Sequence, residues 1–354
     1  MNHHGGQKKG DGFTDYSVNI PKIDFDATFK QLVISSIESL YDYPEIDGET
    51  AKRALAESLG VEIDEIIIGN GATELIYLTA RALKLKKIMI LQPTFTEYAR
   101  AFSLVETELV HFFLEVSHAT FEIDFDVLAN QINSTGCEAL MLCNPNNPTG
   151  TLFTCEQLLT VLNKVKISNF LLMIDESFIE FYESHSSMAQ LMKTGRVLVI
   201  RSMTKIYRVP GLRIGYMIGP KQVMKSIQRF KEPWSLNSIA LKSIPYFLGE
   251  TQYLENLRKW CAEERSFLLE RLSLIKEIRF FHSYANFLLL RYEGTNSIGF
   301  FEALERENMH IRTCHDFMGL DERYFRIAIQ DRTTNLLFIE KIKKVLGRDR
   351  DETL

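Results

Sequence analysis

Lys205 is the side chain in this sequence best suited to covalent chemistry. It follows the apolar run 197–200, which predicts a buried strand, and precedes a Pro210-Gly211 turn. A lysine just past a strand can point into a cleft, where partial burial makes its amine neutral and nucleophilic near neutral pH. A lysine that forms a Schiff base needs this property. Considered alone, Lys205 would be more typical of a solvated loop.

Asp175 is the charged group that changes this interpretation. It ends the apolar run 171–174, so its carboxylate is poorly solvated and needs a cationic partner. A pyridinium N–H would serve as that partner. Lys205 comes one strand–helix–strand crossover later, so the two residues can lie on adjacent or near-adjacent strand ends. Ser202 and Arg213, on either side of Lys205, both suit a phosphate group.

Two loops add further polar groups. In Gly69-Asn70-Gly71-Ala72-Thr73, backbone N–H groups at a helix start and the Thr73 hydroxyl could hold a phosphate, although an ordinary strand–helix turn looks the same. In Asn144-Pro145-Asn146-Asn147-Pro148-Thr149-Gly150, two prolines fix the backbone and pre-set Asn147 to donate to a ligand oxygen. A loop held by asparagine side-chain turns is the alternative.

Taken together, these groups match one ligand. A phosphate cup, a carboxylate for a ring nitrogen, an asparagine for a ring oxygen and a lysine for an aldehyde describe pyridoxal 5′-phosphate, whose ring acts as an electron sink.

The elements that must position these residues alternate along the chain. Apolar runs at 66–68, 87–91, 139–142, 170–174 and 197–200 are separated by helical patterns, which predicts an α/β fold with a mostly parallel sheet covered by helices. Ligands collect at the carboxyl ends of such strands. Beyond about residue 228, long helices (about 245–275) and shorter strands indicate a smaller α+β domain. We expect an N-terminal arm and helix (1–40) packing with the small domain, a large cofactor domain (41–235) and a small domain (236–354).

Composition sets wider limits. The 354 residues are 45% apolar and carry a net charge of -5, which is ordinary for a soluble globular protein and gives no basic footprint for nucleic acid. No apolar run approaches the roughly 20 residues that span a bilayer, and the first twelve residues lack the apolar region of a signal peptide. The five scattered cysteines are expected to be reduced thiols of a cytoplasmic protein. Isolated His111, His118 and His282 lack metal-ligand spacing, and no metal is expected.

The chain resembles the fold-type I pyridoxal-phosphate enzymes, in the class I/II aminotransferase family, over nearly its whole length. The Asn144–Gly150 loop, the Asp175 strand end and the Ser202, Lys205 and Arg213 spacing carry this resemblance. Two subfamilies compete, namely histidinol-phosphate aminotransferase and the L-threonine O-phosphate decarboxylase of cobalamin biosynthesis. The second is the more similar, through the segments His4-Gly5-Gly6, Asp15-Tyr16-Ser17-Val18-Asn19-Ile20, Asp175-Glu176-Ser177-Phe178-Ile179-Glu180-Phe181, Pro233-Trp234-Ser235-Leu236-Asn237, Ala285-Asn286-Phe287-Leu288-Leu289-Leu290, Ile311-Arg312-Thr313-Cys314 and Tyr324-Phe325-Arg326-Ile327-Ala328.

The resemblance implies roles for single residues. Lys205 would bond to the cofactor aldehyde, Asp175 would pair with the ring N–H, and Asn147 would bond the ring oxygen. The other implied cofactor contacts are the stacking ring of Phe95 and the phosphate-binding residues Ala72, Thr73, Ser202 and Arg213. Tyr43 would reach the cofactor phosphate of a neighbouring subunit, which implies a homodimer with shared sites. The implied substrate is a phosphorylated amino acid, bound by His4, Gly5, Gly6, Asn19, Arg312 and Arg326.

Phe178 bears most directly on the reaction. Aminotransferases of this kind usually have a tyrosine there, whose hydroxyl donates to the ring oxygen, and a phenylalanine cannot donate. The resemblance therefore implies decarboxylation of L-threonine O-3-phosphate to (R)-1-amino-2-propanol O-phosphate. A conservative swap without effect on the reaction is the alternative, so histidinol-phosphate transamination remains open. Decarboxylation of L-serine O-phosphate to ethanolamine phosphate also remains open, because that substrate lacks only one methyl group.

Overall fold

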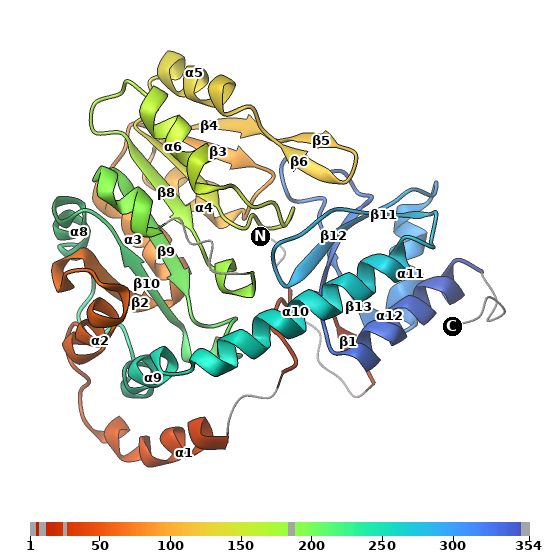
Figure 1. Cartoon of the computed structure of the whole chain (residues 1–354), viewed down its shortest axis with the longest axis horizontal. Helices are drawn as coiled ribbons and strands as arrows, with labels where there is room; N and C mark the ends of the chain where they lie inside the picture. Colours follow the sequence, from red (N-terminus) through yellow and green to blue (C-terminus); the bar gives the residue numbers. More distant parts are fainter. Residues whose placement is uncertain (1–4, 7–11, 24–26, 183–187, 348–354) are drawn as a thin grey trace.

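The chain folds into a large lobe around one sheet and a small lobe around another, with a long helix running between them (Figure 1). The structure is a computed structural model that describes residues 5–6, 12–23, 27–182 and 188–347. No helix in these ranges is long and apolar enough to cross a membrane.

The large sheet has seven strands, and β10 is the one antiparallel member. The residues of β7, β8 and β10 are all buried, and their sequences are mostly apolar. Both features are expected for a sheet covered on both faces. The mostly parallel sheet predicted from the sequence is confirmed. In sheet order the strands are β2 (Ile66–Asn70), β10 (Ile214–Ile218), β9 (Val197–Ser202), β8 (Leu171–Asp175), β7 (Ala139–Cys143), β3 (Lys87–Gln92) and β4 (Glu108–Phe113).

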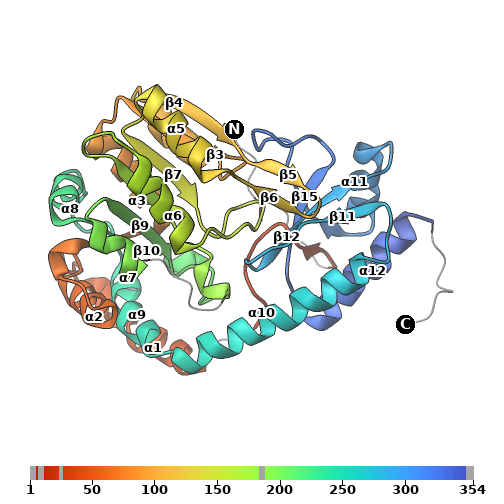
Figure 2. The ribbon, with the colours of Figure 1, turned by 45° about the horizontal axis from the view of Figure 1, so that its top comes forward.

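Helices cover this sheet (Figure 2), and α5 and α6 begin at side-chain caps. Asp124 caps α5 by accepting from two backbone N–H groups, and Thr154 and Gln157 form a capping box on α6. The helices of the large lobe are α2 (Glu49–Leu59), α3 (Gly71–Leu83), α4 (Glu97–Ser103), α5 (Phe125–Thr135), α6 (Cys155–Lys164), α7 (Met188–Leu191) and α8 (Lys221–Gln228).

The small lobe is built on a four-stranded antiparallel sheet, in agreement with the predicted α+β domain. In sheet order its strands are β11 (Ile278–Phe280), β12 (Phe287–Tyr292), β15 (Tyr324–Ala328) and β14 (Arg312–Thr313). Two helices, α11 (Ser297–Arg306) and α12 (Arg332–Val345), pack with it, and two short strands, β5 (Glu115–Ser117) and β6 (Thr120–Glu122), form a separate hairpin.

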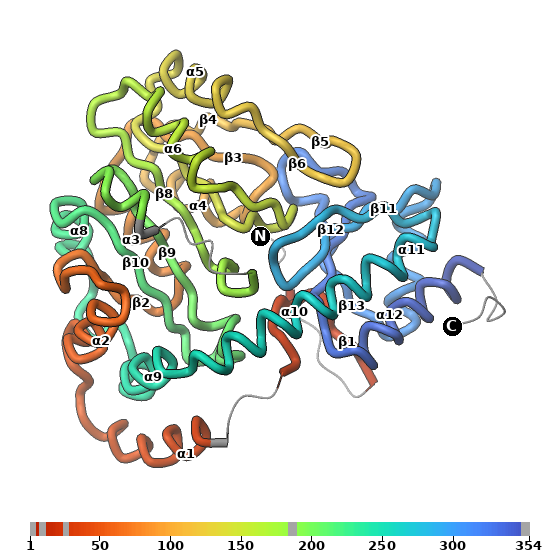
Figure 3. The backbone as a smooth tube through the Cα atoms, viewed as in Figure 1, coloured from red at the N-terminus to blue at the C-terminus, as the bar shows by residue number. Residues whose placement is uncertain are grey.

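The N-terminal segment contacts both parts of the molecule. Strand β1 (Thr14–Asp15) pairs in parallel with β13 (Met309–His310) of the small lobe. Farther along, α1 (Ala27–Ser35) lies against α9 (Ser238–Leu248), where Phe29 packs on Tyr246 and Phe247. Figure 3 shows β1 beside the small lobe and α1 at the bottom of the view, below α2 and α9. The division into domains at 40 and 235 stays a prediction.

One helix boundary differs from the prediction. The sequence predicted long helices over about residues 245–275. In the structure Pro245 lies inside α9, which ends at Leu248, and α10 (Thr251–Leu272) then crosses from the large to the small lobe.

Candidate active site

A cavity of about 340 Å³ lies where the strand ends of the large sheet meet the small lobe and the N-terminal segment. It brings together thirteen of the sixteen predicted site residues, which come from positions 5 to 326 of the chain. Those residues are Gly5, Asn19, Ala72, Thr73, Phe95, Asn147, Asp175, Phe178, Ser202, Lys205, Arg213, Arg312 and Arg326.

The remaining three predicted residues do not line the cavity. Gly6 donates its N–H to Ser17 Oγ at 3.0 Å, which orders the segment beside the cavity. Tyr43 is 85% exposed and packs on Trp234, with ring centroids 5.2 Å apart. His4 lies outside the described residues.

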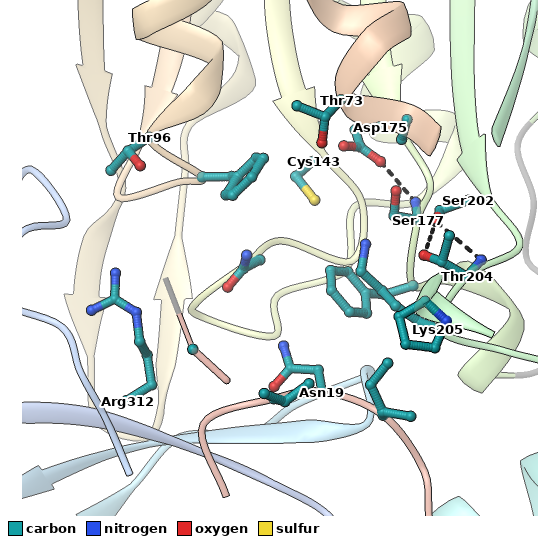
Figure 4. A pocket seen from close by; sticks show the side chains of 18 of the residues that line it. Asn19, Thr73, Thr96, Cys143, Asp175, Ser177, Ser202, Thr204, Lys205 and Arg312 are labelled. Atoms are coloured by element: carbon teal, nitrogen blue, oxygen red, sulfur yellow. Dashed lines mark hydrogen bonds between the residues drawn. The ribbon is translucent and has the colours of Figure 1, made fainter. Parts of the chain in front are cut away.

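One end of the cavity is a cup for an anion. Helix α3 begins at Gly71, where φ is +82°, and a Cβ at this position would come within 2.5 Å of the Arg213 guanidinium. The guanidinium therefore lies against the helix start, where free N–H groups and the helix dipole favour negative charge. Gly215 allows β10 to approach Ala72 closely, because a Cβ there would meet the Ala72 nitrogen at 2.5 Å. The Ser202 and Thr204 hydroxyls, 2.7 Å apart, complete this end (Figure 4).

Asp175 is held at the carboxyl end of β8. Its Oδ1 accepts from the Ser177 N–H at 2.8 Å, and its Oδ2 accepts from the Tyr98 hydroxyl at 2.7 Å. The side chain is 4% exposed. No cation in the described ranges forms a salt bridge with this buried carboxylate, which leaves it suited to a positively charged ring N–H.

Lys205 follows β9, the parallel neighbour of β8, so the predicted closeness of the two strand ends is confirmed. Its Nζ lies 4.5 Å from the centre of the Phe178 ring. Burial lowers the pKa of Lys205 below its ordinary 10.5, and the positive Arg213 and Arg326 act in the same direction, against the negative Asp175. The amine is therefore neutral over more of the pH range than that of a solvated lysine.

The three asparagines of the loop at residues 144–150 make different contacts. Asn144 exchanges two hydrogen bonds with the Phe153 backbone, and Asn146 binds Pro93 O and Thr94. These two side chains hold the loop, whereas Asn147 faces the cavity and accepts from Arg326 Nη1. The structural role predicted for this loop is confirmed for Asn144 and Asn146, and the ligand-binding role of Asn147 stays a prediction.

Two arginines of the small lobe face the cavity. Arg326 Nη2 donates to Ser17 O at 2.9 Å, and its buried Nε has no hydrogen-bond partner in the described chain. Burial lowers the pKa of Arg326 to about 10, and the positive Arg312 acts in the same direction. Arg312 pairs with Asp316 at 2.7 Å and lies across the cavity from Ser202 and Thr204 (Figure 4). Asp175 is the one acidic residue among the described residues that line the cavity, so the site strongly favours anions.

Sequence reasoning missed several contributors. Tyr98, Cys143 and Ser177 line the cavity, and the buried Ser177 Oγ lacks a partner in the described ranges. Glu176, the neighbour of Asp175 in the chain, is buried and pairs with Arg201 at 2.7 Å. The one available signal was position, since Cys143 and Ser177 both fall at strand ends already singled out.

Comparison with known proteins places this site in a family. The model of aminotransferase class I and II matches residues 15–342. The chain belongs to this family. It is therefore a pyridoxal-phosphate-dependent enzyme of the aminotransferase type, as the sequence motifs predicted.

Individual members of the class I and II family are similar along most of the chain. The threonine-phosphate decarboxylase of Salmonella typhimurium is 30% identical over 95% of this chain and 92% of its own length. A protein of Caldanaerobacter subterraneus that carries the same name provisionally is 35% identical over 85% of this chain and 82% of its own. Among solved structures, histidinol-phosphate aminotransferase from Clostridium acetobutylicum is 31% identical, with a TM-score of 0.87 over 94% of this chain and 99% of that one.

Proposed function

We propose that this protein decarboxylates L-threonine O-3-phosphate to (R)-1-amino-2-propanol O-phosphate, a precursor for cobalamin. The observation that carries this proposal is Phe178, whose ring lies beside the Lys205 amine and has no hydroxyl to donate. Aminotransferases of the family usually have a tyrosine at this point. The similarity to threonine-phosphate decarboxylases over most of the chain supports the same reaction.

The described residues fit pyridoxal 5′-phosphate. The α3 start with Arg213 and Ser202 would hold its phosphate, and Asp175 would pair with its ring nitrogen. Lys205 would bond to its aldehyde. The unpartnered Ser177 Oγ, buried in the cavity wall, is a polar group that a bound ligand could satisfy.

The positive side chains of the cavity that are not assigned to the cofactor suit a substrate with two anionic groups. Arg213 lies against the α3 start, so Arg312 and Arg326 are available for the substrate. A phosphate monoester carries about -1.5 to -2 charges near neutral pH, and the amino acid adds a carboxylate. Among the described residues, Arg326 Nε and Asn19 Oδ1 are buried without a hydrogen-bond partner. Arg326 Nε could donate to an anionic group of the substrate, and Asn19 Oδ1 could accept from its amine.

The bound cofactor supplies an electron-poor ring that stabilises negative charge at the Cα of an amino acid. The protein decides which bond at Cα breaks, because Arg312 and Arg326 orient the substrate carboxylate and phosphate. Loss of CO₂ leaves a site at Cα that needs one proton. Lys205 Nζ would deliver this proton, which the neutral amine first takes up from the ammonium group of the substrate.

Histidinol-phosphate transamination is a second candidate, favoured by the 31% identity and the 0.87 TM-score to that aminotransferase. Both substrates carry a phosphate monoester, but histidinol phosphate has no carboxylate, so the two small-lobe arginines favour the phosphorylated amino acid. Serine O-phosphate is a further alternative substrate for decarboxylation.

Product analysis with O-phosphothreonine, O-phosphoserine and histidinol phosphate side by side tests the proposal. We expect amine product and CO₂ from O-phosphothreonine, with turnover of O-phosphoserine lower by a factor of about 10–200, since one methyl group contributes about 1–3 kcal/mol. Conversion of histidinol phosphate that depends on 2-oxoglutarate, without CO₂ from O-phosphothreonine, would refute it.

A further inference from the structure

Tyr98 connects two groups that face the cofactor site. It lies in the first turn of α4, three residues after Phe95, and its backbone N–H donates to Phe95 O at 3.2 Å. Its ring meets the Phe95 ring edge-on, with centroids 5.5 Å apart and an angle of 83° between the planes. Its hydroxyl donates to Asp175 Oδ2 at 2.7 Å. The side chain is 0% exposed, so the surrounding core fixes both contacts.

The two carboxylate oxygens of Asp175 accept hydrogen bonds from different parts of the chain. The Ser177 N–H that holds Oδ1 belongs to the same strand end, two residues along the chain. The Tyr98 hydroxyl that holds Oδ2 comes from another element, 77 residues away in sequence. With both oxygens held, the plane of the carboxylate is fixed before any ligand arrives, which reduces the cost of binding.

We propose that Tyr98 is the positioning residue for Asp175, and that it sets the carboxylate for the ring nitrogen of pyridoxal phosphate while it also supports the Phe95 ring. This role rests on the proposed function. Burial raises the pKa of Tyr98 well above its ordinary 10.0, with negative Asp175 acting in the same direction, so the hydroxyl stays a donor throughout the working pH range.

The conservative substitution Tyr98→Phe isolates the hydroxyl, because it keeps the ring and its contact with Phe95. In the empty cavity, water can reach Asp175 Oδ2 and replace the lost donor. Bound cofactor excludes that water, so the variant carries an unsatisfied carboxylate oxygen only in the loaded state. The defect should therefore fall on cofactor binding rather than on the folding of the apoprotein.

The test is a titration of purified apoprotein with pyridoxal phosphate, followed by the visible absorption of the bound cofactor, together with Tm measurements of the apoproteins. Tyr77→Phe is the matched control, because the Tyr77 hydroxyl on α3 donates to Glu97 on α4, the helix that carries Tyr98, and Tyr77 does not line the cavity. We expect the Kd for pyridoxal phosphate to rise about tenfold in Tyr98→Phe and less than about twofold in Tyr77→Phe, with similar apoprotein Tm values. An unchanged Kd in Tyr98→Phe would overturn the proposal.

A double-mutant cycle with Asp175→Asn asks whether Tyr98 acts through Asp175. If it does, adding Tyr98→Phe to the Asp175→Asn protein changes the Kd little, because the carboxylate to be positioned is gone. A second tenfold rise in that background would assign Tyr98 some other role and overturn the proposal. Wild-type protein that takes up no pyridoxal phosphate would instead refute the proposed function itself.

Discussion

At the scale of single residues, the site depends on where a few charges are buried. The positively charged form of Lys205 is disfavoured by the nearby cations Arg213 and Arg326, and one carboxylate, Asp175, acts against this effect. The structure thus gives the lysine the lowered pKa that the sequence could only suggest as a possibility. The sequence did predict both residues, because each follows an apolar strand directly.

The lowered pKa of Lys205 predicts how cofactor attachment depends on pH. Attachment needs the neutral amine, and a lowered pKa means that the amine is neutral at lower pH than that of a free lysine. The rate at which apoprotein gains the visible cofactor band should therefore level off below pH 10.5. A rate that still rises tenfold per pH unit up to pH 10.5 would contradict this.

The Phe178→Tyr variant tests how far one hydroxyl controls the outcome. Phe178 is 3% exposed, and its ring packs edge-on against Phe287. A tyrosine would place a donor in the cavity wall near Lys205. We expect slower CO₂ release, by about tenfold, and a larger share of keto acid among the products, measured by chromatography. An unchanged product ratio would mean that Phe178 is a neutral replacement.

At the scale of elements, the sequence predicted the strands of the large sheet well. It predicted the side-chain contacts between these strands and the helices poorly. Apolar runs identify β7, β8 and β9, and parallel pairing then brings their polar ends together. Tyr98 escaped prediction because its partner is 77 residues away, and a tyrosine within a helix usually signals packing. The helical stretch predicted at about 245–275 begins earlier in the structure, because α9 starts at Ser238 and includes Pro245.

An ion pair connects α10 to the segment that follows Asp175, and its contribution to stability can be measured. Arg258 on α10 pairs with Glu180, which also pairs with Arg201, and Arg201 in turn binds Glu176. Arg258→Ala leaves the partly buried Glu180 with one cation fewer. We expect a loss of about 1–2 kcal/mol, which lowers Tm by about 2–4 °C.

Lys259→Ala is the matched control for Arg258→Ala. Lys259 is the next residue of α10, its side chain is 78% exposed, and its contact with Glu263 is 4.0 Å long. Such surface pairs contribute little, so Tm should change by less than about 1 °C. Equal Tm changes in the two variants would mean that the Arg258–Glu180 pair does not stabilise the fold.

At the scale of the whole molecule, the surface near Tyr43 predicts self-association. Tyr41 and Tyr43 are 82% and 85% exposed, and Ile37, Leu40 and Ile46 are about half exposed beside them in the chain. An apolar surface of this kind is typical of an interface. We expect light scattering to give twice the chain mass of 40.9 kDa.

The introduction of positive charge on this surface tests the shared-site prediction. Tyr41→Lys with Tyr43→Lys should shift the mass toward the monomer and reduce the affinity for pyridoxal phosphate, because Tyr43 is predicted to reach the neighbouring subunit's cofactor. Val127→Lys is the control, since Val127 is 51% exposed on α5, at the opposite end of the large lobe (Figure 1). A double variant that stays dimeric with full affinity would refute the prediction.

The fate of the substrate carboxyl carbon tests the central proposal most directly. Wild-type protein loaded with pyridoxal phosphate is incubated with carboxyl-labelled O-phospho-L-threonine, and the released gas and the amine product are quantified. The proposed function predicts one labelled CO₂ for each 1-amino-2-propanol O-phosphate formed, with no need for 2-oxoglutarate. Label retained in a keto acid, formed only when 2-oxoglutarate is present, would contradict it.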